Sequence, residues 1–197
     1  MDWDDYEGWG KKISTWGADY HKGLRDYPVR SQVKPGEILS QLDASAPEDG
    51  EQMGDIMNDF NEIVMPGMTH WQHPRFFAYF PSNASPPAIL ADFLTSTIAA
   101  QCMLWQTSPA ATEMETRMME WLRKAVGLPE NFEGVIQDSA SSASLAAVLT
   151  MRERALEWEG NTKGLNGLKR LRIYVSDESH SSIDRAIWIA GIGEENL

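Results

Sequence analysis

Two short polar turns hold the residues of this sequence that are best suited to chemistry. The first, residues 137–144, reads Gln-Asp-Ser-Ala-Ser-Ser-Ala-Ser and lies between a candidate strand and a candidate helix. A helix N-terminus offers free N–H groups and the positive end of the helix dipole, and serine hydroxyls add further donors. The turn is therefore a candidate phosphate site, with an ordinary serine N-cap as the alternative. The Asp138 carboxylate disfavours phosphate binding at this turn, because the two negative charges repel each other.

The second turn, residues 176–182, reads Ser-Asp-Glu-Ser-His-Ser-Ser. It also follows a candidate strand and precedes a candidate helix, so it should lie at the same edge of the sheet, where open α/β sheets bind ligands. His180 could stack on a ring or move a proton near neutral pH. A lone histidine in a turn can also be a polar residue with satisfied hydrogen bonds, and the residues alone leave both interpretations open.

His70 and His73 have the spacing His-x-x-His, which is found in some metal sites. Such a pair suits a metal when it lies on a helix and a third ligand completes the site. Pro74 disfavours a helix here, so we predict no metal site. Cys102, the only cysteine, can form no internal disulfide, and its apolar surroundings predict a buried small residue in a helical stretch.

Residues 70–85 form a dense aromatic segment that is interrupted by prolines. Proline removes a backbone donor from a sheet, so this segment is not a regular central strand. We expect an extended loop with a rigid aromatic surface. It either crosses the core or forms the wall of a pocket for a flat substrate.

The second half of the sequence predicts alternating strands and helices. Short apolar runs at 134–137 and 171–175 indicate strands, and helices should follow at about 143–158 and from 183 to about 190. A glycine-rich loop is expected at 161–167. This order is typical of an α/β fold with parallel strands and right-handed crossovers.

The first half predicts helices with aromatic and aliphatic stripes. Apolar residues recur at three- and four-residue steps over 3–20 and 53–64, and Pro66-Gly67 should end the second stripe. Ser85-Pro86 and Ser108-Pro109 should each begin a helix with a serine cap, the latter with a buried stripe over 114–125. We expect such apolar stripes to be buried, either against the rest of the chain or against a second subunit.

Composition narrows the class of protein. The chain has 197 residues, 42% of them hydrophobic, and a formal net charge of −12. The excess of carboxylates disfavours nucleic acid and anionic membranes as partners. From the acidic start we expect no secretory signal, and the apolar runs are too short to span a bilayer. With a single cysteine, the expected location is the reducing cytoplasm.

Four blocks in order make the sequence recognisable. Residues 69–81, 104–110 with 113–115, 135–141 and 176–182 resemble the characteristic segments of the group II decarboxylases that depend on pyridoxal 5′-phosphate (PLP). Within that group the sequence is most similar to the aromatic-L-amino-acid and tyrosine decarboxylases. Arg25, Pro28, residues 33–36 and residues 55–57 also match the family's N-terminal arm, so the resemblance covers nearly the whole chain.

The resemblance implies a fold and an activity. The fold would be α/β: an N-terminal helical dimerisation arm, residues 1–66, followed by the first part of a fold-type-I PLP-transferase (aspartate-aminotransferase-like) large domain, residues 67–197. The activity would be PLP-dependent decarboxylation of an aromatic L-amino acid, of the tyrosine, DOPA or tryptophan type, to the amine and CO₂.

The resemblance also implies roles for individual residues. Ala140 and Ser141 would hold the cofactor phosphate, and His180 would stack on the pyridine ring and assist the protonation step. Gln101 and Met103 would reach into the pocket of a neighbouring subunit in a dimer. The substrate pocket would be lined by Trp71, Tyr79, Phe80, Pro81 and Ser82.

The chain departs from the family pattern in three respects. Asp138 stands where the family usually has glycine, and Ser82 where many relatives have threonine. No lysine up to Leu197 lies in the context of the family's Schiff-base lysine, and Lys163 and Lys169 precede the second candidate strand. We therefore expect a second chain to supply the C-terminal portion, including that lysine and the aspartate that pairs with the pyridine nitrogen. The alternatives are a non-catalytic dimerisation fragment, an aldehyde synthase, or a decarboxylase of a non-aromatic amino acid.

Overall fold

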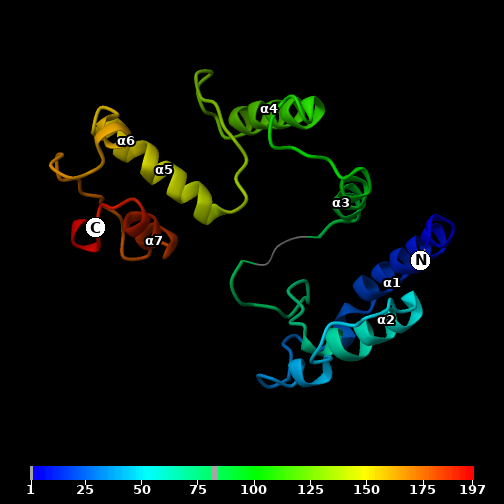
Figure 1. The fold of residues 1–197 in the computed structure, drawn as a ribbon. Helices are drawn as coiled ribbons and strands as arrows, with labels where there is room; N and C mark the ends of the chain where they lie inside the picture. The colour runs from blue at the N-terminus through cyan, green and yellow to red at the C-terminus, as the bar shows by residue number, and fades with distance from the viewer. Residues whose placement is uncertain (1, 81–83) are drawn as a thin grey trace. The chain divides into compact units, whose positions relative to one another are not determined.

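The computed structural model describes residues 2–80 and 84–197. These residues gather into two compact units, Met1–Ala99 and Ala100–Leu197, each with its own internal packing (Figure 1). The predicted division at residues 66 and 67 separates a dimerisation arm from a cofactor domain, and it stays a prediction. None of the helices in the described ranges is long and apolar enough to cross a membrane.

The first unit begins with α1, Trp3–Lys22, which confirms the helix predicted from the aromatic stripe. The Asp2 carboxylate accepts hydrogen bonds from the backbone N–H groups of Asp4 and Asp5, at 2.9 and 3.1 Å, and so caps the helix. Basic residues in the last turn complement the negative end of the helix dipole. A short 3₁₀ turn, Leu24–Asp26, follows.

A second helical segment packs on α1 in this unit. A 3₁₀ turn, Leu39–Gln41, comes first, and then α2, Met53–Asp59. A π-helical turn, Phe60–Val64, and a 3₁₀ turn, Met65–Gly67, end the segment at the predicted Pro-Gly pair.

Trp16 joins α1 to this second segment. Its indole Nε1–H donates to the Asn61 side-chain oxygen at 3.0 Å, and its ring lies edge-on to Phe60 with centroids 5.2 Å apart. Aromatic pairs favour this edge-to-face arrangement. The two stripes that the sequence predicted therefore meet each other in part.

Helix α3, Pro86–Ile98, completes the first unit and begins as predicted. The Ser85 hydroxyl accepts from the backbone N–H of Ala88 at 3.4 Å, and proline occupies the first turn. The Tyr6 ring of α1 stacks on Phe93 with centroids 6.1 Å apart. Much of the apolar surface of α3 stays exposed, including Leu94 and Ile98.

In the second unit, α4, Pro109–Ala125, has the predicted position but neither the predicted cap nor the predicted buried stripe. The Ser108 side chain accepts no hydrogen bond from the first turn. Met114 is 68% exposed, and Trp121 and Leu122 are exposed too. A stripe is buried only when another element packs on it, and in the described residues of this unit none covers this face of α4.

The core of the second unit lies between α5, Ala140–Ala155, and α7, Ser182–Ile189. Val148, Ala186 and Ala190 are buried together, and partly buried aliphatic side chains pack around them. The Arg152 guanidinium donates to the Ala190 carbonyl at 2.8 Å, so the C-terminal ends of the two helices lie together (Figure 1).

Shorter elements surround this core. Helix α5 begins three residues before the predicted position and ends at Ala155. Helix α6, Glu159–Lys163, occupies part of the stretch predicted as a glycine-rich loop. A 3₁₀ turn, Glu194–Asn196, follows α7.

The strands predicted at 134–137 and 171–175 are not formed in the described part of the chain. The Ile136 N–H donates to the Glu115 carboxylate at 2.7 Å, and the Ile173 N–H donates to the Asn196 carbonyl at 2.9 Å. A strand requires a neighbouring strand whose amides and carbonyls meet its own. Here these backbone groups bond to a side chain and to a turn instead.

Cys102 also differs from its prediction. It is exposed, and it lies outside any helix, in the segment between α3 and α4. The prediction was wrong because apolar neighbours in sequence do not bury a residue unless the segment itself packs against something.

Candidate functional site

The serine turn before α5 presents free backbone donors. The Ser139 hydroxyl accepts from the Ser142 N–H at 3.2 Å, which makes Ser139 the N-cap. The Ser139 carbonyl accepts from Ala143 at 3.0 Å. Among the described residues, the backbone N–H groups of Ala140 and Ser141 have no hydrogen-bond acceptor.

These donors fit a phosphate group. The first-turn amides of a 16-residue helix carry the positive end of its dipole, and they can point at an anion. Ala140 and Ser141 are exposed and small, so an anion can come close to the backbone. The Asp138 carboxylate is the unfavourable neighbour. The turn can therefore be both a serine N-cap and a phosphate site, because Ser139 caps the helix while the next two amides stay free.

His180 lies at the start of α7 and is exposed. Its Nδ1 accepts from the Ser182 N–H at 3.1 Å, and its carbonyl accepts from Ile183 at 3.0 Å. An Nδ1 atom that accepts a hydrogen bond carries no proton, so the neutral ring has its proton on Nε2. The backbone therefore orients the ring and leaves Nε2 for another partner.

The serine turn and the histidine turn each begin one of the two helices that form the core of this unit. The C-terminal ends of α5 and α7 meet through Arg152 and Ala190. Within the described ranges, no hydrogen bond connects Ser141 with His180. The two predicted cofactor positions thus lie on one packed helix pair, with no hydrogen bond between them in the described residues.

The aromatic segment of the first unit forms a small platform of stacked rings. Trp71 stacks on Tyr79 with centroids 5.5 Å apart and packs against Phe76 at 4.9 Å. Tyr79 has a φ of +55°, a left-handed conformation that is rare for a bulky residue and concentrates at functional sites. Phe80 is 99% exposed. These rings can present flat apolar surface to a ligand.

The other predicted pocket residues are not brought to this platform by the described contacts. Pro81 and Ser82 lie outside the described residues. Gln101 and Met103 belong to the second unit, where both are exposed, Met103 by 75%. Exposure suits the predicted role of reaching into a neighbouring subunit, which stays a prediction.

His70 and His73 serve the fold of the first unit. Both are buried, and His73 Nδ1 accepts from the Arg75 backbone N–H at 3.0 Å. His70 Nδ1 is hydrogen-bonded to the Tyr20 hydroxyl at 2.9 Å. Among the described residues, no group of three or more metal-ligating side chains comes together.

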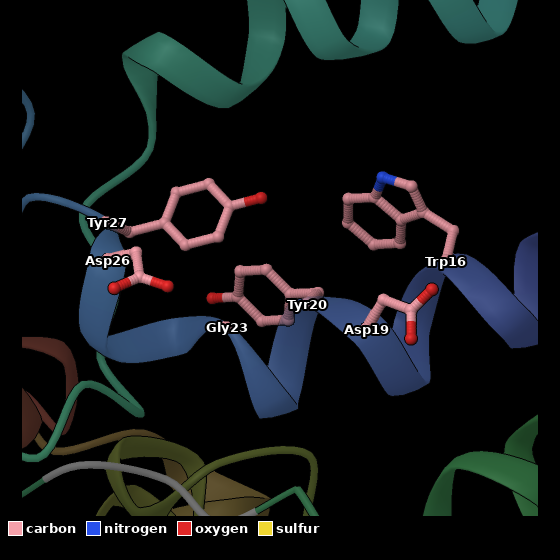
Figure 2. Close-up of a pocket in the computed structure, with 6 residues that line it drawn as sticks. All are labelled: Trp16, Asp19, Tyr20, Gly23, Asp26 and Tyr27. Carbon is pink, nitrogen blue, oxygen red and sulfur yellow. The ribbon is translucent and has the colours of Figure 1, made fainter.

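Sequence reasoning missed the polar and aromatic cluster around Tyr20. A pocket of about 380 Å³ lies beside it, where Trp16 and Tyr20 from α1 lie near the Tyr27 ring (Figure 2). Asp19, Gly23 and Asp26 complete its lining. The available signal was the spacing of Trp16 and Tyr20 by one helical turn, which places both rings on one face of α1.

Comparisons with known proteins place the chain in one protein family. The pyridoxal-dependent decarboxylase conserved domain matches residues 35–196. Phenylacetaldehyde synthase of Arabidopsis thaliana is 40% identical over 202 residues, which cover 100% of this chain and 40% of that protein. Aromatic-L-amino-acid decarboxylase of Sus scrofa is 41% identical over 204 residues, covering 98% of this chain and 42% of that protein.

The fold comparison gives the same result. The crystal structure of Oryza sativa TDC with PLP and tryptamine matches with a TM-score of 0.90 and 35% identity, covering 100% of this chain and 43% of that one. This similarity confirms the predicted fold class, although paired strands are missing from the described residues. The chain spans about two fifths of the length of these relatives.

Proposed function

Because this chain belongs to the pyridoxal-dependent decarboxylase family, we propose that it is part of an enzyme that converts an aromatic L-amino acid to its amine and CO₂. Pyridoxal 5′-phosphate is the cofactor of the family. The match over residues 35–196 is the observation that carries the proposal. It includes the serine turn, the histidine turn and the aromatic platform, which are the parts that such a reaction needs.

The second unit supplies the groups that hold the cofactor. The free amides of Ala140 and Ser141 would hold the cofactor phosphate, assisted by the Ser141 hydroxyl. When bound, PLP supplies an electron sink for the pair that is released as CO₂ leaves. His180 would face the bound cofactor, and its Nε2 would be the atom that can hold a proton for the product carbon, because Nδ1 accepts from the Ser182 amide.

The first unit supplies the wall of the substrate pocket. The stacked rings of Trp71 and Tyr79 favour a flat side chain, and the exposed Phe80 extends the same surface. Exclusion of water by such a surface strengthens the polar contacts that orient the substrate.

Two partners belong to the proposal. The remainder of the enzyme supplies the Schiff-base lysine and the aspartate that pairs with the pyridine nitrogen, which agrees with relatives about two and a half times as long. A second, homologous subunit forms a dimer in which Gln101 and Met103 reach the neighbouring pocket. We assign the enzyme to the cytoplasm on the basis of its single cysteine and acidic composition.

One specific observation favours a second activity. Phenylacetaldehyde synthase of Arabidopsis thaliana has 40% identity with the chain, similar to that of the animal decarboxylase. The same scaffold therefore serves relatives with aldehyde products and relatives with amine products. The alternative proposal is an aldehyde synthase that acts on an aromatic L-amino acid.

Product analysis tests the proposal. Every polypeptide of the purified protein is first identified by intact mass, and the preparation is then incubated with PLP and L-tyrosine, L-DOPA or L-tryptophan. We expect the amine and CO₂ from at least one substrate, together with visible absorbance from bound PLP. An aldehyde in place of the amine would support the second activity. Neither product, with no PLP absorbance, would overturn both in favour of a dimerisation fragment.

A further inference from the structure

The His70 ring is the most enclosed polar group beside the aromatic platform. The residue is 3% exposed, and its ring lies between two tyrosines, with centroids 4.7 Å from Tyr27 and 5.6 Å from Tyr20. A buried imidazole needs hydrogen-bond partners, because leaving it without them costs free energy. The identity of those partners shows what His70 does in the fold.

Hydrogen bonds attach His70 to separate segments of the first unit. Its Nδ1 bonds to the Tyr20 hydroxyl of α1 at 2.9 Å, and its backbone N–H donates to the Val29 carbonyl at 3.0 Å. Its own carbonyl accepts from the His73 N–H at 2.9 Å, which closes the turn that contains Trp71. His70 therefore connects α1 directly to the start of the aromatic segment.

The protonation states agree with a Tyr20 hydroxyl that donates to His70. Burial lowers the pKa of His70, and the nearby His73 acts in the same direction, so the ring is neutral near pH 7. Burial raises the pKa of the Tyr20 hydroxyl, with a further contribution from Tyr27, so the hydroxyl keeps its proton. A neutral ring with a free Nδ1 is an acceptor for that proton.

The connection reaches the platform through one peptide bond. Trp71 follows His70 directly, and its ring packs on Tyr79 and Phe76. Trp71 is 41% exposed, so its own burial restrains it only in part. The backbone anchor at His70 is thus a main restraint on where the Trp71 ring lies.

From this geometry we infer that Tyr20 and His70 are positioning residues for the substrate pocket: their hydrogen bond sets the place of the Trp71–Tyr79 platform. The inference rests on the proposed function, because it takes Trp71 and Tyr79 as pocket residues. It adds that the first helix of the chain controls substrate affinity through a contact with a residue fifty positions away.

Tyr20 and Tyr27 form a matched pair for the test. Both rings pack on His70, but within the described residues only the Tyr20 hydroxyl is hydrogen-bonded to it. The complete enzyme is compared as unmodified protein, Tyr20→Phe and Tyr27→Phe. Hydrogen exchange of residues 69–79, followed by mass spectrometry without substrate, reports on the segment, and steady-state kinetics report on KM and kcat.

For Tyr20→Phe we expect faster exchange in residues 69–79 and a KM raised about three- to tenfold, the factor expected for one lost neutral hydrogen bond. The kcat should stay within about twofold, because the reacting atoms are not changed. Tyr27→Phe should resemble the unmodified enzyme in exchange and kinetics. His70→Asn, which retains an acceptor near the Nδ1 position, should raise KM less than His70→Leu does.

The outcomes separate this inference from the proposed function. If the unmodified enzyme is active and Tyr20→Phe changes neither exchange nor KM, or changes them no more than Tyr27→Phe, the inference is overturned and the function stands. If kcat falls with KM unchanged, Tyr20 does not act through substrate positioning. If the unmodified enzyme has no activity on aromatic amino acids, the function and the pocket assignment both fail. The exchange data then still decide whether Tyr20 holds the segment.

Discussion

The surroundings of His70 and His180 differ in almost every physical respect. His70 is buried between two aromatic rings, and its Nδ1 is bonded to a side chain fifty residues away. His180 is exposed, and its Nδ1 is bonded to the backbone N–H two residues further along the chain. Each ring is oriented through Nδ1, but the first is held by tertiary contacts and the second by its own turn.

This difference separates a histidine that holds the fold from one that is available for chemistry. A buried ring whose partners come from other elements contributes to stability, and replacing it disturbs several segments. An exposed ring oriented by a local amide contributes little to stability and can offer Nε2 to a ligand. Four predictions test this contrast, beginning with the largest expected effect.

Replacement of His180 should have the largest effect, and it should fall on activity alone. His180→Asn keeps an acceptor for the Ser182 N–H and removes Nε2. We expect kcat of the complete enzyme to fall about 10²- to 10⁴-fold, the usual contribution of a positioned acid or base. The free energy of unfolding, from urea titration, should change by less than about 0.5 kcal/mol. A variant that retains nearly full kcat would contradict the assignment of His180.

Replacement of His70 should lower the stability of the fold, in addition to its expected effect on KM. His70→Leu leaves the Tyr20 hydroxyl without its acceptor inside the first unit, so the free energy of unfolding should fall by about 1–3 kcal/mol. His21→Leu is the control, because His21 is exposed at the end of α1 and should cost less than about 0.5 kcal/mol. Equal effects of the two substitutions in urea titration would remove the contrast between a buried and an exposed histidine.

The helix starts of the second unit permit a smaller test of local orientation. Ser139 bonds the Ser142 N–H, whereas Ser108 bonds no amide of its helix. Ser139→Ala should therefore lower the free energy of unfolding by about 1 kcal/mol, whereas Ser108→Ala should lower it by only about 0.3 kcal/mol. Ser139→Ala should also weaken PLP binding in a fluorescence titration, because the amides of the first turn lose their order. Equal stability losses would show that the cap is not important at Ser139.

The pH dependence should show the smallest effect. The pKa of His70 in the folded protein lies below its ordinary value of 6.5, so the unfolded chain binds its proton first as the pH falls. Above pH 6.5, the protonation of His70 should therefore not affect the free energy of unfolding. Below that pH the free energy of unfolding should decrease, until the folded protein also binds the proton. The urea midpoint of the unmodified protein should therefore fall further than that of His70→Leu between about pH 7.5 and pH 5.5. Identical pH profiles would show that another group dominates.

Local patterns were enough to predict several helices and to single out two candidate cofactor turns. The stripe over residues 3–20 predicted α1, and Ser85 with its following prolines predicted the start of α3. Caps and periodicity depend on residues within about two turns, so the sequence shows them directly. The family blocks at 135–141 and 176–182 also identified both turns, and the family match confirms the resemblance.

Burial was the part that local patterns predicted poorly. The stripe on α4 is exposed, Cys102 is exposed, and the predicted strands at 134–137 and 171–175 lack partners in the described residues. Each of these predictions assumed a neighbour that only the folded chain can supply. Conversely, the deep burial of His70 could not be derived from the His-x-x-His spacing.

By itself, the sequence determined where α1, α3 and α4 begin, which turns carry serine and histidine, and which family the chain resembles. Only the tertiary structure decided that Tyr20 bonds to His70, that His180 is exposed, and that α5 packs on α7. The physical reason is range. Caps, dipoles and periodicity act between residues close together in the chain, whereas burial and the partner of a buried polar group depend on segments that meet only after folding.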